Sequence, residues 1–384
     1  MGAAAGRWAG PARGRDPPLP RLEAPGGPMN PADPRVAVVV VTWNGRGHLA
    51  RCLPALAAQT WPAVEVVVAD NGSTDGTVAW LAETWPAVRV LALGANLGFA
   101  EANNRAIRAT DTRWVALLNN DTLPSPGWVA ASMAAARADA RIGAVASRML
   151  FMDDPGTINS AGIAVDRAGI AWDRLGGAPA ADGDAPAAVF GASAGAALYR
   201  RAALDDVAEP GPDGAPAVFD PRFFMYLEDV DLAWRLQLRG WRCAYAPEAR
   251  VLHHGSASAG EGSAFKNRLL ARNKVWTVVK NYPAGPLLAW CPAIVAYDLG
   301  SAPYRLLFQG QTAAVRGRID ALAGLGPVLR QRRRIQARRT ATWAEVSLGL
   351  EPLASPWGVL RRYRHLARRR GDGPRAVSDS SADA

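Results

Sequence analysis

Runs of hydrophobic, mostly β-branched residues alternate with helix-like segments in the first third of the chain. Four such runs predict buried strands: Val36–Thr42, Val64–Asp70, Val88–Leu93 and Trp114–Asn119. The segments between them predict helices: Arg46–Ala58, Thr74–Glu83 and Phe99–Ala109. Continuous apolar strands joined by single helices indicate an α/β fold with a doubly wound, mostly parallel sheet. Ligands of such sheets bind beyond the carboxyl ends of the strands, so polar residues there are site candidates.

The pattern becomes less regular after residue 126. Four further elements are predicted there: a helix at Pro126–Ala138, a strand entering a short helix at Gly191–Arg201, an amphipathic helix at Tyr226–Gly240, and a strand followed by a histidine-bearing loop at Trp241–Ser258. Stretches rich in Trp, Tyr and Leu follow from Phe265, and then an arginine-rich tail.

The turn after the first strand fits a dinucleotide-binding fingerprint. Gly45, Gly47 and Ala50 match G-x-G-x-x-[GA], and Asp70 lies 20 residues beyond Ala50. However, Thr42-Trp43-Asn44 separates the glycines from the strand, and bulk at that turn blocks a pyrophosphate. A polar strand–helix turn explains the glycines adequately, so we set dinucleotide binding aside.

Two other strand ends carry carboxylates. Asp70 begins "DNGSTDGT", which we expect to enter a helix capped by Ser73 or Thr74. A carboxylate at this strand end is placed to accept the imino N–H of a uracil or thymine base. In "LLNNDT", Asn119 and Asp121 offer oxygens for a hard divalent cation beside a diphosphate. An Asx turn explains the same residues, so that alternative stays open.

The segment "GANLGFAEANNRAI" places asparagines at the same predicted edge. Asn96 and Gly98 fall in the loop, and Asn103 and Asn104 fall on the following helix. Asparagine is unfavourable inside a helix. Two adjacent ones therefore indicate recruitment for hydrogen bonding.

Taken together, these segments resemble glycosyltransferase family 2, the nucleotide-diphospho-sugar transferases of the GT-A fold, and especially its rhamnosyltransferase-like branch. The resemblance runs from about Arg35 to Ser258. Six motifs carry it in order: "VVVVTWNGRGHL", "ADNGSTDGT", "NLGFAEANNRAI", "LLNNDT", "FFMYLEDVDLAWRLQLRGW" and "VLHHGSAS".

The resemblance implies a nucleotide site at the predicted edge. The base-binding candidates are Thr42, Asn44 and Asp70. The residues expected to flank the nucleotide are Asn96, Gly98 and Asn103. Rhamnose from dTDP-rhamnose is the favoured donor sugar, and other UDP- or dTDP-sugars, including galactofuranose and N-acetylhexosamine donors, stay open.

The resemblance also implies a divalent cation, Mg²⁺ or Mn²⁺. The family's Asp-x-Asp motif has Asn119 at its first position here, which leaves Asp121 as its acid. An asparagine oxygen ligates such a cation without lending charge. A further ligand is expected from the late histidine loop, where His253 matches and His254 is its neighbour.

Family position assigns the general base to Asp229, with Glu228 as a supporting neighbour. An acid at the start of a helix also interacts favourably with the helix dipole and its free N–H groups, which would explain any single acid here. Asp231 is a third acid in this turn, and three exceed what the helix start requires. The implied reaction is attack by an acceptor hydroxyl with inversion of the anomeric carbon.

Charge is concentrated near the C-terminus. The formal net charge is +10, and residues 316–370 hold 14 Arg against three acids. The rest is about neutral, which argues against nucleic-acid binding and for one basic region. Three widely spaced cysteines indicate neither a disulfide framework nor a zinc site, which fits a reducing compartment.

A membrane surface is the expected partner of this basic region. Pro286–Phe308 is long enough to span a bilayer, but it contains Asp298, Arg305 and the internal prolines Pro292 and Pro303. We expect a helix pair lying in the interface, with the arginines facing anionic lipid on the inner face of the plasma membrane. This predicts a cytoplasmic, peripherally bound enzyme with a glycan or lipid-linked glycan acceptor. A helical subdomain with merely solvated arginines is the alternative.

These predictions divide the chain into four parts: a disordered N-terminal segment (1–34), the GT-A domain (35–262), a helical, arginine-rich membrane-surface extension (263–370) and a disordered tail (371–384). Translation from Met1 or from Met29 stays open. Two rival functions were weighed. A sugar-nucleotide pyrophosphorylase requires a basic, glycine-rich loop where this chain has Thr42-Trp43-Asn44. A non-catalytic nucleotide-sugar binding protein at the membrane surface stays open as the alternative.

Overall fold

The computed structural model describes residues 34–254, 263–309 and 312–355 of the 384. The predictions of disorder at 1–33 and 371–384, and of a loop at 255–258, lie outside the described residues. The same holds for the arginines between 361 and 370.

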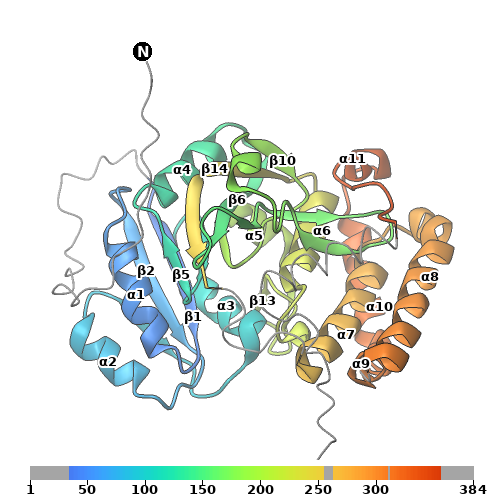
Figure 1. Cartoon of the computed structure of the whole chain (residues 1–384), viewed down its shortest axis with the longest axis horizontal. Coiled ribbons are helices and arrows are strands. Elements are labelled where there is room, and N and C mark those ends of the chain that lie inside the picture. Colours follow the sequence, from blue (N-terminus) through green and yellow to red (C-terminus); the bar gives the residue numbers. More distant parts are fainter. Residues whose placement is uncertain (1–33, 255–262, 310–311, 356–384) are drawn as a thin grey trace, which may run out of the picture.

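A ten-stranded sheet forms the centre of the described chain (Figure 1). Its order is β10-β14-β6-β11-β4-β1-β2-β3, with β5 on β14 and β7 on β6. The strands are β1 (Val36–Thr42), β2 (Val64–Asp70), β3 (Arg89–Ala92), β4 (Trp114–Asn119), β5 (Thr122–Pro124), β6 (Ile142–Phe151), β7 (Ile158–Ser160), β10 (Ala187–Val189), β11 (Ala196–Arg200) and β14 (Arg242–His253). Strands β1 to β4 pair in parallel as predicted, and β11 runs antiparallel between β4 and β6. Two small hairpins lie outside this sheet: β8 (Ile163–Val165) with β9 (Ala171–Asp173), and β12 (Glu209–Pro210) with β13 (Pro216–Ala217).

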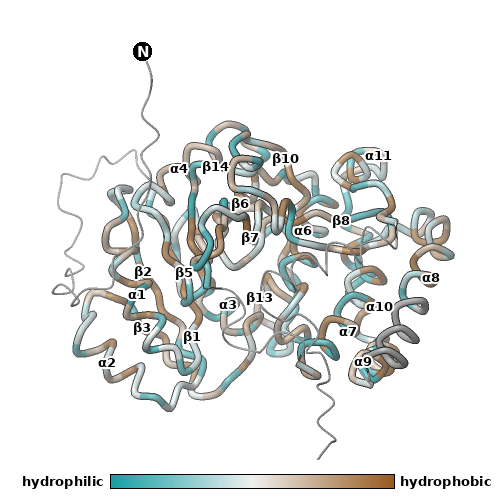
Figure 2. The backbone as a smooth tube through the Cα atoms, viewed as in Figure 1, coloured by the Kyte–Doolittle hydropathy of each residue, from teal (hydrophilic) through white to brown (hydrophobic). Residues whose placement is uncertain are grey.

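Helices cover both faces of the sheet because its central strands are apolar on both sides. Val38 and Val40 of β1 pack with residues of α1 and α4, whereas Val39 packs with residues of α3. Alternate residues of a strand point to opposite faces, so an unbroken valine run requires cover on both. These helices are α1 (Arg46–Ala57), α2 (Thr77–Thr84), α3 (Gly98–Arg108), α4 (Trp128–Arg137), α5 (Arg201–Val207) and α6 (Glu228–Leu238). Figure 2 shows the hydrophobic residues along β1 and β2 in brown.

The predicted start of the second helix is wrong. The helix begins at Thr77 after Gly76, whose φ of 79° suits glycine, and neither Ser73 nor Thr74 caps it. Instead, the Asp75 carboxylate accepts the Thr77 backbone N–H at 3.1 Å.

The C-terminal helices pack on the sheet domain through α7 (Ala264–Asn281), which contacts α6 (Figure 1, right). They continue with α8 (Ala284–Gln309), α9 (Thr312–Ala323), α10 (Leu325–Arg338) and α11 (Trp343–Ser347). The expected helix pair at 286–308 is one helix, α8. Asp298, one of the charges that argued against a bilayer-spanning helix, pairs with Arg318 at 2.7 Å and Lys274 at 3.6 Å. None of the described helices combines the length and the hydropathy that a bilayer crossing requires.

Candidate active site

The carboxyl ends of three strands bring the predicted residues to one edge of the sheet. Thr42 at the end of β1 is in register with Asp70 of β2, and Val41 with Asn119 of β4. The side chain of Asn120, which the motif analysis did not assign, donates to Thr42 Oγ1 at 2.8 Å. This bond links the end of β1 to the Asn-Asn-Asp turn.

Asp70 has one unsatisfied carboxylate oxygen. Its side chain is buried, and Oδ2 accepts the Ser73 N–H at 3.1 Å. Among the described residues Oδ1 has no hydrogen-bond partner. A buried acceptor without a donor is costly, so a ligand N–H at this point is favourable.

Asn44 and Asn96 organise the loops around Asp70. Asn44, with a φ of 50°, accepts the Thr74 N–H at 2.7 Å on its side-chain oxygen. Asn96 is bonded to Asn71, which the sequence analysis missed: Asn71 Nδ2 donates to Asn96 Oδ1 at 3.0 Å. The Asn71 oxygen also accepts the Leu97 N–H at 2.8 Å. Its place directly after the strand-end acid was the available signal.

Helix α3, which follows this loop, packs against residues 219–224. At Gly98, with a φ of 81°, an added Cβ would lie 2.5 Å from the ring of Phe224. Asn103 is buried and donates to the Phe99 carbonyl at 2.9 Å within its own helix. Asn104 exchanges two hydrogen bonds with the backbone of Phe219, so its role is structural.

Asp121 and His253 lie side by side. His253 Nε2 is 3.4 Å from Asp121 Oδ1, and Nδ1 is 2.9 Å from Asn159 Oδ1. His253 was predicted in a loop but is the last residue of β14, paired with Thr122 of β5. His254 donates its backbone N–H to the Asp121 carbonyl at 3.0 Å. Burial opposes ionisation of Asp121, yet the hydrogen bond and charge of His253 keep the pKa of that carboxyl below its usual value.

This pair fits an octahedral cation. Ligands of Mg²⁺ at about 2.1 Å lie about 3 Å apart when adjacent, close to the separation of these two atoms. The Asn159 oxygen can accept a proton held on Nδ1, the tautomer in which the Nε2 lone pair would face a metal in place of the hydrogen bond to Asp121. Across the described residues no three His, Cys, Asp or Glu side chains form a metal cluster. A cation held by Asp121 and His253 would take its other ligands from phosphate and water, as in many magnesium sites.

The acids at the start of α6 have different environments. Asp231 is fully buried and pairs with Lys280 at 2.9 Å and Arg235 at 3.0 Å, so it is structural. Asp229 accepts the Ala194 N–H at 3.2 Å; burial raises its pKa to about 6 despite that bond. Glu228 is buried with Oε2 unpartnered within the described chain, and burial next to Asp229 raises its pKa well above the usual value.

The loop that precedes these acids is strained. Phe224, Tyr226 and Leu227 have φ values of 64°, 70° and 65°. Such conformations cost roughly 1–3 kcal/mol each for side chains with a Cβ. They persist only when the surroundings hold them, which is frequent at functional sites.

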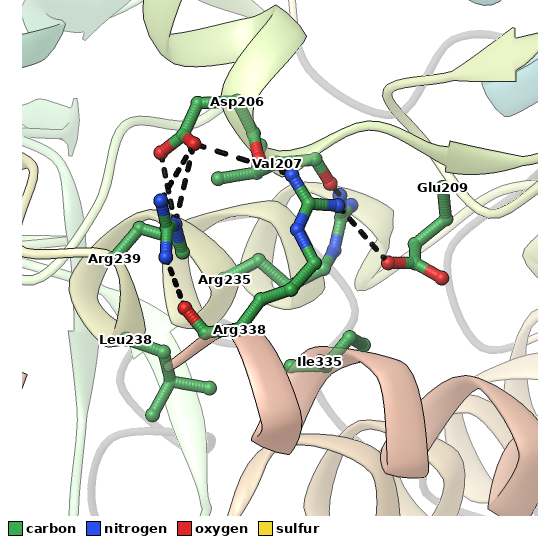
Figure 3. Close-up of a pocket in the computed structure, with 8 residues that line it drawn as sticks. All are labelled: Asp206, Val207, Glu209, Arg235, Leu238, Arg239, Ile335 and Arg338. Atoms are coloured by element: carbon green, nitrogen blue, oxygen red, sulfur yellow. Dashed lines mark hydrogen bonds and ion pairs between the residues drawn. The ribbon is translucent and has the colours of Figure 1, made fainter. Parts of the chain in front are cut away.

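The C-terminal arginines fall into two sets. Arg334 and Arg338 of α10 pair with Glu209 at 2.7 and 3.6 Å, next to Arg239 at the end of α6, which pairs with Asp206 at 2.9 Å. Figure 3 shows Arg338, Arg239 and their acidic partners around a pocket between α5, α6 and α10. Other arginines of α9 and α10 are exposed and have no ion pair with the described residues: Arg316, Arg330 and Arg333.

The site therefore combines the carboxyl ends of parallel strands, the Asp121–His253 pair and the buried acids of α6 on a mostly parallel α/β sheet of the GT-A type. The family model described as glycosyl transferase family 2 matches residues 37–208. The chain is 35% identical over 261 residues to an N-acetylglucosaminyl-diphospho-decaprenol L-rhamnosyltransferase of Mycobacterium tuberculosis. The aligned region covers 62% of this chain and 81% of that protein. The chain belongs to glycosyltransferase family 2, and within it is rhamnosyltransferase-like.

More distant proteins share parts of the chain. The O-antigen biosynthesis protein RfbC of Myxococcus xanthus is 28% identical over 240 residues, 59% of this chain and 18% of that protein. The structure of GalNAc-T7 with UDP, GalNAc and Mn²⁺ superposes with a TM-score of 0.50 at 16% identity and covers 65% of this chain. This chain spans 48% of that one, and the likeness concerns the fold alone.

Proposed function

We propose that this protein is an inverting, metal-dependent glycosyltransferase of cell-envelope polysaccharide synthesis. It transfers a sugar, with dTDP-rhamnose as the favoured donor, to a hydroxyl of a glycan or lipid-linked glycan. The observation that carries the proposal is the meeting of Asp70, Asp121 and His253 at one sheet edge. The rhamnosyl donor and lipid-linked acceptor are supported by the 35% identity to the rhamnosyltransferase.

The donor binds along the carboxyl edge of β1, β2 and β4. The unpaired Oδ1 of Asp70 accepts the imino N–H of a thymine or uracil base, next to Thr42. Asn44 and Asn96 shape the loops on either side, and Gly98 and Asn103 belong to the helix that closes the site.

Asp121 and His253 would hold Mg²⁺ or Mn²⁺, with Asn119, two residues before Asp121, as a further oxygen donor. A cation bound there would supply positive charge to the departing diphosphate. The Asn159 oxygen can accept the Nδ1 proton of His253 in the tautomer that ligation needs.

Asp229 takes the proton from the acceptor hydroxyl as the hydroxyl oxygen attacks the anomeric carbon. The raised pKa of about 6 makes this carboxylate a stronger base while it stays mostly ionised at neutral pH. Glu228 lies beside it and supports the acceptor. Attack from the face opposite to the departing nucleotide inverts the anomeric centre.

We also propose that the enzyme acts at the cytoplasmic face of the membrane through α9 and α10. Three exposed arginines accompany three exposed large apolar residues there: Arg316, Arg330 and Arg333 with Ile319, Leu322 and Leu329. Each arginine contributes about 1 kcal/mol toward an anionic surface.

Sedimentation with phosphatidylglycerol vesicles tests this surface. Replacing Arg316, Arg330 and Arg333 by Gln should weaken binding on the order of 100-fold. Arg334→Gln is the matched control, because Arg334 is engaged by Glu209. Full-length protein that ignores anionic vesicles at low salt contradicts the membrane proposal and leaves the transferase proposal intact.

A donor panel tests the enzymatic proposal. Nucleotide release is measured with dTDP-rhamnose, other dTDP- and UDP-sugars, and a guanine nucleotide sugar, with Mg²⁺ or Mn²⁺ and a lipid-diphosphate-linked sugar acceptor. We expect turnover with a thymine or uracil donor. Preference for the guanine donor contradicts the role of Asp70, and binding without turnover of any donor favours the non-catalytic alternative.

A further inference from the structure

The loop from Arg222 to Leu227, here the 222–227 loop, has a conformation that its own sequence disfavours. The Met225 N–H donates to the Phe223 carbonyl at 2.7 Å, and Phe224 between them has φ 64° and ψ −62°. This is a strained γ-turn. Leu227 is the N-cap residue of α6, so the path of this loop sets the place of Asp229 two residues later.

One asparagine of α7 directs its two amide N–H groups at three carbonyls of this loop, which share them. Asn273 Nδ2 lies 3.1 Å from the Phe223 oxygen, 3.0 Å from that of Met225 and 2.7 Å from that of Tyr226. The side chain of Asn273 is completely buried. Without it, the Met225 and Tyr226 carbonyls lose this buried donor, whereas the Phe223 carbonyl keeps the Met225 N–H and Arg272.

Arg272 completes the contact and orients the amide. Its Nε donates to Asn273 Oδ1 at 2.9 Å, which directs the amide nitrogen of Asn273 toward the loop. Its terminal nitrogen bonds to the carbonyls of Arg222 at 2.8 Å and Phe223 at 3.0 Å. The guanidinium also lies over the ring of Trp276, 4.5 Å from its centroid.

The carbonyl of Phe224, the central residue of the turn, is bonded to helix α3. The Phe224 oxygen accepts the Ala100 N–H at 3.1 Å, in the first turn of α3. Gly98 allows this approach, since a Cβ there would lie 2.6 Å from the same oxygen. The 222–227 loop is therefore fixed between the helix of the donor side and α7.

We propose that Asn273, oriented by Arg272, is a positioning residue that sets the Asp229 carboxylate relative to the bound donor. This inference rests on the proposed function of Asp229. Loss of the amide lets the strained turn relax toward ordinary φ values and moves the start of α6. Thr42, Asp70 and Asp121 lie in other parts of the chain, so we expect the donor contacts there to be kept.

Steady-state kinetics of Asn273→Ala test the proposal in the full-length protein. We expect kcat to fall about 100-fold, as for a reacting group displaced by about 1 Å, with the donor KM within about threefold. Asn281→Ala is the matched control: Asn281 is equally buried on the same helix and bonds to Asp231 and Thr277, not to the loop. We expect it to lower the unfolding temperature while kcat stays within about threefold. Arg272→Met, which keeps the stem over Trp276, gives the same kcat-selective loss and serves if Asn273→Ala does not fold.

A double-mutant cycle with Asp229→Asn separates this inference from the proposed function. In the Asp229→Asn background, Asn273→Ala should cost no further activity, because it acts through that carboxylate. Transfer by Asp229→Asn within about threefold of wild type overturns the base assignment itself. If Asp229→Asn is slower by about 10²-fold or more while Asn273→Ala loses no more kcat than Asn281→Ala, or raises the donor KM in proportion, the positioning role alone is wrong.

Discussion

Replacing Lys280 by Met should destabilise the protein strongly, because this lysine joins two buried acids. Its Nζ lies 3.0 Å from Asp220 and 2.9 Å from Asp231, and all three side chains are at most 3% exposed. Removing one partner of a buried ion pair typically costs about 3–5 kcal/mol. Each acid keeps an arginine, Arg222 at 2.6 Å and Arg235 at 3.0 Å, so we expect about 3 kcal/mol, the lower end of that range.

The stability that Lys280→Met loses should become smaller as the pH falls. Burial opposes ionisation of Asp220, but Lys280 and Arg222 hold the pKa of its carboxyl well below the usual value. A depressed pKa adds stability that is present above the unfolded pKa, about 4, and is lost as the pH falls toward the folded one. Without Lys280 the pKa rises, so the gap between wild type and variant should narrow below about pH 4.

Urea unfolding followed by tryptophan fluorescence measures both effects at pH 7 and at pH 3.5. Arg35→Met is the control, since Arg35 makes an exposed pair with Glu65 that is worth at most about 1 kcal/mol. A loss below about 1 kcal/mol for Lys280→Met at pH 7, or a gap that widens in acid, would refute the reasoning.

Three further predictions concern the site. Asp121→Ala and His253→Ala should each raise the Mg²⁺ or Mn²⁺ concentration needed for half-maximal transfer, and full activity in excess chelator would contradict a metal site. Gly98→Ala should lower the unfolding midpoint and impair donor binding, because its Cβ would lie 2.5 Å from the Phe224 ring at a φ of 81°; Gly47→Ala, with open space around it, should be harmless. Transfer should fall as the pH drops below about 6, where Asp229 takes up a proton, and a profile flat down to pH 5 would exclude this carboxylate as the base.

The parallel half of the sheet was predictable from the sequence because it is apolar on both faces. Observed β1, β2 and β4 have the predicted bounds, since each is a mainly hydrophobic run, interrupted only by Glu65 in β2, that ends at a polar residue. The insertion of β11 between β4 and β6 was not predictable, because local pattern does not report which strands pair.

Site residues within sequence motifs could be predicted, whereas contacts between residues far apart in the chain could not. Asp121 and His253 were paired from family position, but the contact of His253 with Asn159, 94 residues away, has no local signal. Positive φ values at Phe224, Tyr226 and Leu227 are invisible in a sequence, because such residues rarely adopt them. The support that Asn273 gives this loop was missed for the same reason, since it depends on that fold.

The most direct test of the central claim is to measure donor binding and sugar transfer on Asp229→Asn side by side. Calorimetry gives the affinity for the nucleotide sugar, and a single-turnover reaction with metal and acceptor gives the rate of transfer. The substitution keeps the side-chain size and one of the two oxygens that accept the Ala194 and Val230 N–H groups. We predict donor affinity within about threefold of wild type and transfer slower by about 10²–10⁴-fold, the usual loss when a general base is removed. Transfer within about threefold of wild type would contradict Asp229 as the base and the mechanism built on it.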